Sequence, residues 1–342
     1  MKLKVRLLFI ITLCVLIASG SVLAQKTKGK AKQKKQPASV LTYEYDAKVI
    51  GKHGDEVLGV FVNDKNTQVA TCSLDETIKI WSLPEGKEIH TLTGHLGAVN
   101  NVSFSGNDQM LASASTDQTV RIWDVASGKE KKVLRGHQAP VIGVFFNQDE
   151  QSSLVASTSF DRTVKLWDVN TGTEIKTLRG HKLPANNVAY SYDGTLLASC
   201  SDDKTIILWS TDLEKKEPVM VLTGHDAPVL TVLFSFDSKL LASSDQDGII
   251  KIWSIPSGEC IRTIKAHDEL IQDVSFAEDS KRLVSASLDK TVKIWEVDTG
   301  FNLMMFNAGV EIWSVDLTSD LSQIILGCAD STVRLLTRKG DK

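Results

Sequence analysis

The chain repeats one stretch of sequence along most of its 342 residues. The clearest copy runs from Gly94 to Asp124 and reads GHLGAVNNVSFSGNDQMLASASTDQTVRIWD. Six tryptophans, each with an aspartate six residues before it, mark the register: Trp81, Trp123, Trp167, Trp209, Trp253 and Trp295. Their spacing alternates between 42 and 44 residues, and a seventh copy keeps Asp330 but has Leu336 in place of tryptophan. Self-similarity at such a period predicts a repeat architecture.

Each copy contains four short strands separated by turns. In the clearest copy the strands are expected at residues 99–104, 111–115 and 119–123, where apolar and polar residues alternate, with a fourth after the turn at 127–129. A four-stranded antiparallel sheet of this size is too small to be stable alone. Stacking such sheets around an axis buries both faces of each sheet and leaves only short edges exposed.

The Gly-His at the start of the repeat, the Asp before its third strand and the Trp-Asp at the end of that strand resemble the WD-repeat β-propeller family. The resemblance extends from Tyr43 to Thr337. It implies an all-β fold, a seven-bladed β-propeller of four-stranded antiparallel blades. The N-terminal segment, residues 41–53, has the pattern of an outer strand, and the seventh copy has room for only three strands. We therefore expect the N-terminal strand to pair with residues 332–336 and close the ring.

The resemblance also implies that a His, a Ser or Thr, an Asp and a Trp are hydrogen-bonded in each blade. Ser113 and Ser115 lie on the same face of their strand, so the sequence does not choose between them. These residue types also form hydrolase triads, but a set repeated in every blade indicates a structural role. The expected members are His95, Asp117, Trp123, His137, Asp161, Trp167, His181, Asp203, Trp209, His225, Asp247, Trp253, His267, Asp289 and Trp295.

The N-terminal residues have a different composition from the repeats. Three basic residues precede an apolar run and a small-residue stretch ending at Ala24, the pattern of a signal peptide; an uncleaved membrane anchor is the alternative. The sequence divides into residues 1–24, signal or anchor; 25–40, a basic flexible tail; 41–338, the propeller; and 339–342, a C-terminal tail. A cleaved signal would place the protein outside the cytoplasm, whereas an anchor would hold it at a membrane.

Charge separates the tail from the repeats. Nine of the 39 basic residues and none of the 42 acidic ones fall in residues 1–35, so the rest of the chain has a net charge of −12. Binding to nucleic acid needs a basic surface, so this class of partner is not expected. A basic protein surface is the better electrostatic match. The four cysteines after Cys14 are expected to be free buried thiols, because Cys72 and Cys200 occupy equivalent places in separate blades.

Residues that vary from copy to copy are the candidates for partner binding, and two sets of them should lie around one rim of the ring. The first set is five residues after each repeat histidine, or after Ala308 in the seventh copy: Leu58, Asn100, Ile142, Asn186, Leu230, Gln272 and Trp313. The second set directly precedes the turn aspartates: Leu74, Thr116, Phe160, Asp202, Gln246, Leu288 and Ala329. A rim rich in apolar residues indicates a protein interface, although Trp313 could instead pack in the core.

The sequence contains no phosphate-binding glycine loop, no HExxH, no CxxC and no GxSxG, so we expect neither an enzyme nor a bound cofactor or metal. The expected function is a non-catalytic scaffold, monomeric or part of a hetero-complex, that binds a protein or peptide at its rim. Contact with a membrane would involve only residues 1–37. The alternatives are a membrane-tethered scaffold and an exported enzyme with a site in the central channel, for which Asp202 is the one acidic candidate on the rim.

Overall fold

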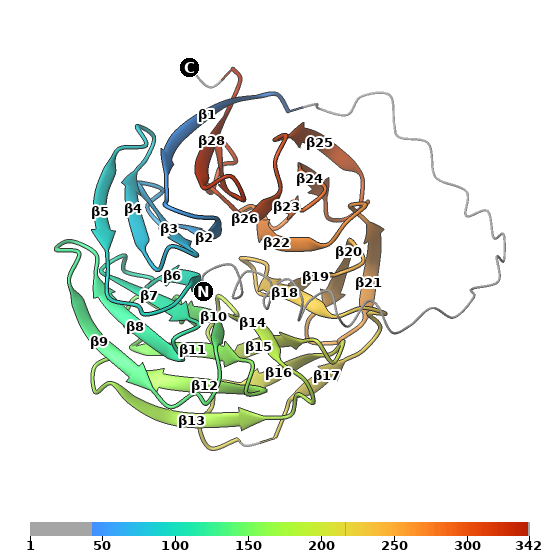
Figure 1. Cartoon of the computed structure of the whole chain (residues 1–342). Coiled ribbons are helices and arrows are strands. Elements are labelled where there is room, and N and C mark those ends of the chain that lie inside the picture. Colours follow the sequence, from blue (N-terminus) through green and yellow to red (C-terminus); the bar gives the residue numbers. More distant parts are fainter. Residues whose placement is uncertain (1–42, 216, 341–342) are drawn as a thin grey trace, which may run out of the picture. The chain divides into compact units, whose positions relative to one another are not determined.

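The computed structural model describes residues 43–215 and 217–340, which form 28 strands. The strands make seven four-stranded antiparallel sheets, the blades, arranged around a central axis (Figure 1). The expected seven-bladed β-propeller is therefore confirmed. The expectations for residues 1–24 and 25–40 fall outside the described residues. Within the described ranges, no helix has the length and apolar character needed to cross a bilayer.

Blades 1 to 6 each consist of four consecutive strands, and chain order within a blade runs from the inner strand outward. Blade 1 contains β2 (Val57–Val62), β3 (Gln68–Ser73), β4 (Ile78–Ser82) and β5 (Glu88–Leu92). Blade 2 contains β6 (Val99–Phe104), β7 (Met110–Ser115), β8 (Thr119–Asp124) and β9 (Glu130–Arg135). Blade 3 contains β10 (Val141–Phe146), β11 (Leu154–Ser159), β12 (Thr163–Asp168) and β13 (Thr173–Arg179).

Blades 4 to 6 follow the same order, and blade 4 has the shortest outer strand. Blade 4 contains β14 (Ala185–Tyr190), β15 (Leu196–Ser201), β16 (Ile206–Ser210) and β17 (Met220–Leu222). Blade 5 contains β18 (Val229–Phe234), β19 (Leu240–Asp245), β20 (Ile249–Ser254) and β21 (Cys260–Lys265). Blade 6 contains β22 (Ile271–Phe276), β23 (Arg282–Ser287), β24 (Thr291–Glu296) and β25 (Asn302–Asn307).

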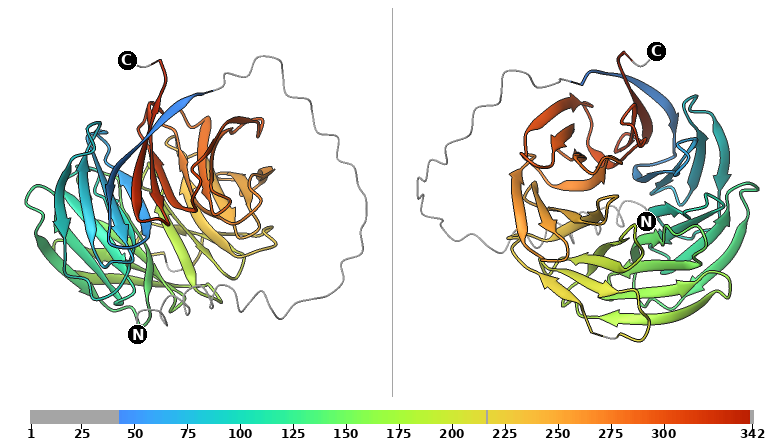
Figure 2. Two further views of the ribbon diagram at one scale, coloured as in Figure 1. Left: turned by 45° about the horizontal axis from the view of Figure 1, so that its top comes forward. Right: turned by 180° about the vertical axis from the view of Figure 1, so that it is seen from behind.

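Blade 7 joins the two ends of the propeller. It contains β26 (Ile312–Leu317), β27 (Gln323–Cys328) and β28 (Thr332–Arg338), and its outer strand is β1 (Tyr45–Lys52). β1 pairs with β28 in antiparallel register from Tyr45 opposite Arg338 to Lys52 opposite Thr332, and the two strands lie side by side in all views (Figure 2). The expected closure of the ring by hydrogen bonds is therefore confirmed.

Apolar packing between consecutive blades forms the core. The tryptophan on the third strand of a blade packs against the blade before it: Trp123 of blade 2 lies in one cluster with Ile78, Ile80 and Leu92 of blade 1. Trp81 of blade 1 packs in the same way against Val333 and Leu335 of blade 7. Since each cluster combines side chains of neighbouring blades, the hydrophobic stabilisation of every blade depends on its neighbours.

The inner strands need a second kind of contact, because their free edges carry backbone N–H groups that have no neighbouring strand. Side chains from the preceding blade accept hydrogen bonds from these groups. Asn101 Oδ1 accepts from Val144 N at 3.3 Å, and Ser103 Oγ accepts from Phe146 N at 3.1 Å. At the closure, Asp316 Oδ2 of blade 7 accepts from Val62 N of blade 1 at 2.8 Å.

Removing residues 41–52 should abolish cooperative unfolding, because β28 would lose its partner and the cluster around Trp81 would lose its cover. Differential scanning calorimetry should show a broad transition or none. A variant lacking only residues 341–342, which follow the closing strand, serves as the control. A sharp transition in the larger deletion, at the temperature of the intact chain, would show that β1 does not hold the ring together.

Candidate functional site

A buried chain of hydrogen bonds recurs near one end of the blades. In blade 2, Trp123 Nε1 donates to Ser113 Oγ at 2.9 Å, and Ser113 Oγ lies 2.7 Å from His95 Nε2. His95 Nδ1 lies 2.8 Å from Asp117 Oδ2. Ser113 is therefore the network serine. Ser115 instead accepts from Asp117 N and donates to the Gly97 carbonyl oxygen, so it shapes the turn beside the network.

Donor and acceptor capacities fix the direction of this chain. The indole N–H of Trp123 can only donate, so the Ser113 hydroxyl uses its own hydrogen to donate to His95 Nε2. The carboxylate of Asp117 can only accept, so His95 Nδ1 carries the other hydrogen. The distances resemble those of a Ser-His-Asp triad, but the Ser113 hydroxyl is capped by the indole and has no exposed surface. The arrangement is therefore structural.

The predicted members in blades 3, 4 and 6 take equivalent positions. Asp161, Asp203 and Asp289 accept from the histidines of their blades at 2.8 Å, 3.2 Å and 2.8 Å. The tryptophan–serine and serine–histidine distances are 2.7–2.9 Å. The residues involved are His137, Ser157 and Trp167; His181, Ser199 and Trp209; and His267, Ser285 and Trp295.

The first and last blades vary the pattern. Blade 1 has a complete network that was not among the predicted sets, in which Thr71 takes the serine position between Trp81 and His53. A threonine in register with the serines was the available signal. In blade 7, Arg334 takes the place of the network: it donates to Asp330 Oδ2 at 2.6 Å and to the Ala308 carbonyl oxygen at 2.6 Å.

Blade 5 departs from the prediction. His225 Nδ1 contacts Asp245 Oδ2 at 2.7 Å, whereas Asp247 was expected in this role. Asp245 occupies the position of Ser115, and its other oxygen accepts from the backbone N–H groups of Asp247 and Ile249, both at 3.0 Å. Ile249 stands where the other blades have a threonine that donates to the turn aspartate. Asp247 is therefore exposed at the surface and outside the network.

The networks shift the pKa values of their members. Burial by itself would raise the pKa of Asp117, but hydrogen bonds from His95 and Thr119 outweigh it and hold the pKa well below its usual range. The carboxyls of Asp75, Asp161 and Asp203 have pKa values lowered for the same reasons. Burial lowers the pKa of His267 to about 4, which keeps its ring neutral at pH 7 and preserves the direction of the hydrogen bonds.

The predicted rim positions form two matching rings at the network end of the blades. Leu58, Asn100, Ile142, Asn186, Leu230, Gln272 and Trp313 are each the second residue of an inner strand, and Leu74, Phe160, Asp202 and Leu288 each follow the end of a second strand. In every blade the N–H of the second set donates to the carbonyl oxygen two residues before the first set, at 3.0–3.3 Å. The backbone therefore presents these side chains in the same way seven times.

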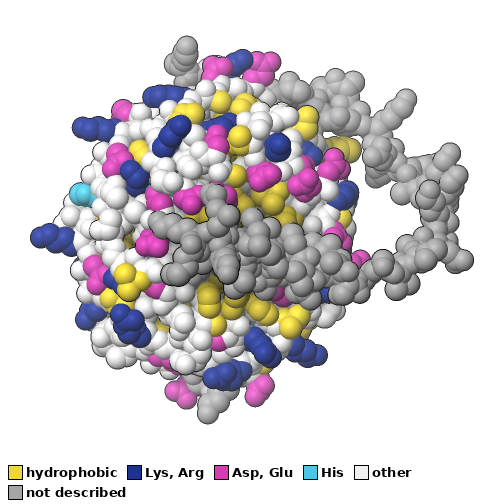
Figure 3. Space-filling view, in the orientation of Figure 1, with side chains coloured by type: hydrophobic (Ala, Val, Ile, Leu, Met, Phe, Trp, Pro, Cys, Tyr) yellow, Lys and Arg dark blue, Asp and Glu magenta, His cyan; other side chains and the backbone are white. Residues whose placement is uncertain are grey.

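Side chains at the rim differ in how they are used. Asn100 donates to the Val141 carbonyl oxygen at 2.7 Å, and Asn186 donates to the Val229 carbonyl oxygen at 2.9 Å. Both asparagines thus tie one blade to the next. Trp313 is half-buried, and its indole N–H is buried without a hydrogen-bond partner. Figure 3 shows hydrophobic side chains gathered near the middle of one face of the ring, with acidic side chains around them.

Two half-buried carboxyls lie on the inner strands of blades 6 and 7. Asp273 accepts from Ser314 Oγ at 2.6 Å and Val315 N at 3.2 Å, and Asp316 accepts from Ser275 Oγ at 2.7 Å. Burial raises the pKa of Asp273 to about 7 and that of Asp316 to about 6. Both side chains are used in contacts between blades. Within the described ranges, no group of three potential metal ligands comes together.

Three of the four cysteines in the described part of the chain, Cys72, Cys200 and Cys328, are buried free thiols, as expected. Cys260 is also free but exposed, so the expectation of burial was wrong for this residue. It lies on β21, an outer strand, where alternate side chains face solvent.

Comparison with known families agrees with this geometry. The family model WD40, described as "WD domain, G-beta repeat", matches residues 46–82, 86–124, 128–168, 172–210, 216–254 and 258–296. The matches cover more than half of the chain, which therefore belongs to the WD-repeat family, whose propellers are generally non-enzymatic scaffolds for protein interactions. The first match begins in β1 and each of the others begins just before the outer strand of a blade; every match ends in the third strand of the next blade. No curated protein gives a significant match.

Replacing Asp245 by Asn should destabilise the protein by about 1.5–3 kcal/mol, because all three partners of its carboxylate are donors and an amide presents only one acceptor oxygen. The matched change Asp247→Asn should alter the free energy of unfolding by no more than about 0.5 kcal/mol. Urea unfolding measures both. Equal decreases in the free energy of unfolding of the two variants would contradict the hydrogen-bond arrangement described for blade 5.

The free energy of unfolding should fall as pH rises from about 5 to 8. A carboxyl whose pKa is raised by folding contributes stability that is complete below its unfolded value and is lost as pH passes the folded value, here about 7 for Asp273. The change should be on the order of a few kcal/mol at most. Asp273→Asn should flatten this slope in urea titrations at several pH values. An unchanged slope would exclude Asp273 as its source.

Proposed function

We propose that this protein is a non-catalytic scaffold that binds a protein or peptide partner at the rim formed by the two rings of variable positions. The proposal depends on one observation: the backbone of the rim is the same in every blade, whereas the side chains that it presents differ from blade to blade. Seven equivalent turns present residues as different as Phe160, Asp202 and Ala329. A rigid frame with variable side chains at one end suits recognition of another macromolecule, because little ordering cost remains at binding.

The apolar members of the rim are the expected anchors. Aromatic side chains dominate the binding energy of many interfaces, and a surrounding polar border keeps water away from them. Leu58, Leu74, Ile142, Leu230 and Leu288 are half-buried, so each presents part of its apolar surface. Trp313 and Phe160 are the aromatic residues of the two rings. Asn100 and Asn186 support the frame, and Gln272 contributes polar contact.

Alanine at both Trp313 and Phe160 should weaken binding of the native partners by about 2 kcal/mol or more. Quantitative affinity purification from the native source, followed by mass spectrometry, measures this loss. The matched control changes Val219 and Met305 to alanine, since these side chains, directly before β17 and on β25, are 50% and 63% exposed but lie away from the rim. Thermal melting checks that both variants fold. Retention of the same proteins by the rim variant, at the level of the control, would refute the proposal.

We propose further that the protein is exported, because the N-terminal sequence has a basic start, an apolar run and a small-residue stretch ending at Ala24. The mature chain is then expected to begin at Gln25. Sequencing the N-terminus of the native protein tests this expectation. A native chain that still contains residues 1–24 and requires detergent for extraction would favour the membrane-tethered alternative.

A further inference from the structure

A cleft in blade 5 adds a second kind of contact to the proposed rim. Its volume is about 540 Å³, within the range of sites that hold a ligand side chain or small molecule. The loop before β18 contributes Asp226, the turn after β19 contributes Gln246 and Asp247, and the loop before β22 contributes Asp268. Lys251 on β20 and Lys265 on β21 form part of its wall.

The cleft occurs where blade 5 has lost two features of the repeat. The first is the hydrogen bond between the histidine and the turn aspartate. In blade 5, His225 is bonded to Asp245 instead, which leaves the Asp247 carboxylate at the surface. The second is an ion pair across the third and fourth strands. In blades 1 and 3, Lys79 and Lys165 each pair with a glutamate at 2.7 Å, whereas blade 5 has Cys260 in the position of that glutamate.

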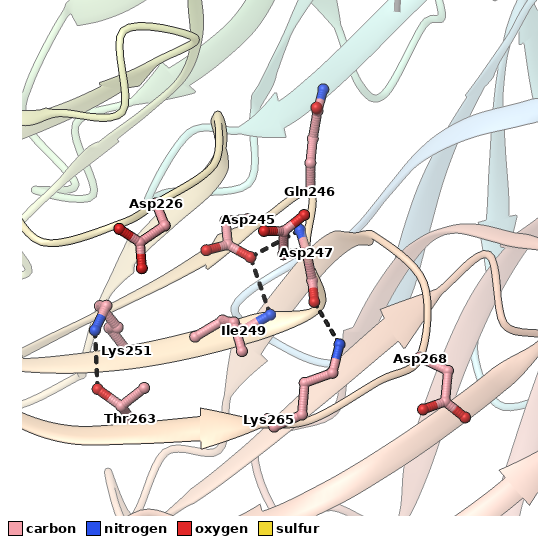
Figure 4. A pocket seen from close by; sticks show the side chains of 9 residues that line it. All are labelled: Asp226, Asp245, Gln246, Asp247, Ile249, Lys251, Thr263, Lys265 and Asp268. Carbon is pink, nitrogen blue, oxygen red and sulfur yellow. Dashed lines mark hydrogen bonds between the residues drawn. The ribbon is translucent and has the colours of Figure 1, made fainter. Parts of the chain in front are cut away.

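Both acidic and basic side chains line the cleft. Lys251 Nζ donates to Thr263 Oγ1 on the neighbouring strand at 2.9 Å, whereas Lys265 Nζ donates to the Asp247 carbonyl oxygen at 2.5 Å, which places its ammonium group at the turn. Figure 4 shows Asp226 and Asp268 on opposite sides, with Asp247 between them. The three carboxylates come from the loops and the turn at the rim, where a partner lying on the rim can reach them.

Charged side chains are unevenly distributed around the rim, and the acidic ones gather on the side that contains blade 5. We counted charged residues in the loops before the inner strands and in the turns after the second strands. Carboxylates bonded to histidine, and Asp330, which pairs with Arg334, were left out. In blades 5, 6, 7 and 1 these segments contain one base, Lys290. They contain eight acids: Asp226, Asp247, Asp268, Glu269, Glu311, Asp55, Glu56 and Glu76. The same segments of blades 2 to 4 contain three bases, Arg162, Lys182 and Lys204, and one acid outside the networks, Asp202.

We propose that the blade 5 cleft receives a basic side chain, arginine or lysine, of the protein partner that lies on the rim. This inference rests on the proposed function and specifies the chemistry and orientation of the partner. Its basic residues lie over blades 5 to 1, and its apolar residues contact Trp313 and Phe160. A guanidinium suits a cleft lined by carboxylates, because it presents several N–H donors in one plane.

The test uses three fluorescein-labelled synthetic peptides of 12 residues, with a central Leu-Phe pair followed by three arginines, three citrullines or three glutamates. Fluorescence anisotropy at several NaCl concentrations measures their binding to the whole chain. The arginine peptide should bind at least ten-fold more tightly than the citrulline peptide, and the difference should shrink with salt. Equal binding of these two peptides, tighter binding of the glutamate peptide, or no binding of the arginine peptide would overturn the proposal.

The matched variants separate this inference from the proposed function. Changing Asp226, Asp247 and Asp268 to Asn should weaken the arginine peptide at least ten-fold and leave the citrulline peptide unchanged. The control changes Glu214, Glu217 and Glu259 to Gln, which removes the same charge from exposed loops between the third and outer strands of blades 4 and 5. If the triple Asn variant and the control bind the arginine peptide with equal affinity, the proposed role of the cleft is refuted. The Trp313→Ala and Phe160→Ala double variant should weaken binding of both the arginine and the citrulline peptide. If it does so while the intact protein binds these two peptides equally, the proposed binding at the rim is supported and the proposed role of the cleft is refuted.

Discussion

Each blade of this protein is a four-stranded sheet with two apolar faces, and neither face can be buried within the blade. This constraint determines the ring. Trp123 completes its cluster on Ile80 of the blade before, and Trp81 does so on Leu335 at the junction of the two chain ends. Because every interface is shared, an open ring would expose two apolar faces at once. The pairing of β1 with β28 removes that exposure and protects the edge of the last blade.

The buried hydrogen-bond chain gives the ring a precise rim. A donor at one end, the indole, and an acceptor at the other, the carboxylate, leave one consistent arrangement of hydrogens for the serine and histidine between them. The carboxylate also holds the turn: Asp117 accepts from Leu96 N at 3.1 Å and from Thr119 N at 3.0 Å. The rim residues lie directly beside these bonds, so their backbone is fixed while their side chains remain free to differ.

Blade 5 shows how that frame can be kept while a surface group is released. Asp245 makes the contact with His225 from a position two residues earlier, and the turn keeps its shape. The Asp247 carboxylate then has no part in the fold, and Cys260 stands where blades 1 and 3 have the glutamate of a strand-to-strand ion pair. The cleft lies beside the acidic half of the rim. A local change in the hydrogen-bond pattern thus leaves the turn carboxylate of blade 5 at the surface.

Much of the fold could be predicted because the repeat contains its own register. The spacing of the six tryptophans, together with the seventh copy around Asp330, indicated the number of blades, and the three-stranded last copy indicated how the ring closes. The individual site residues were harder, because spacing identifies positions and not contacts. It pointed to Asp247, six residues before Trp253, and could not distinguish Ser113 from Ser115, which share a face of one strand. It also placed Asn100 and Asn186 among the partner-binding residues, although their amides bond to the next blade.

By itself, the sequence determined the architecture: a period of four strands with apolar faces has few ways to be buried, and a closed ring is the one that leaves no large edge. Tertiary structure alone decided which carboxylate holds His225, which serine is sealed by the indole, and where Asp226, Asp247 and Asp268 surround a cleft. These outcomes depend on distances of about 3 Å between residues in separate strands and loops. Only the packed ring brings such residues together.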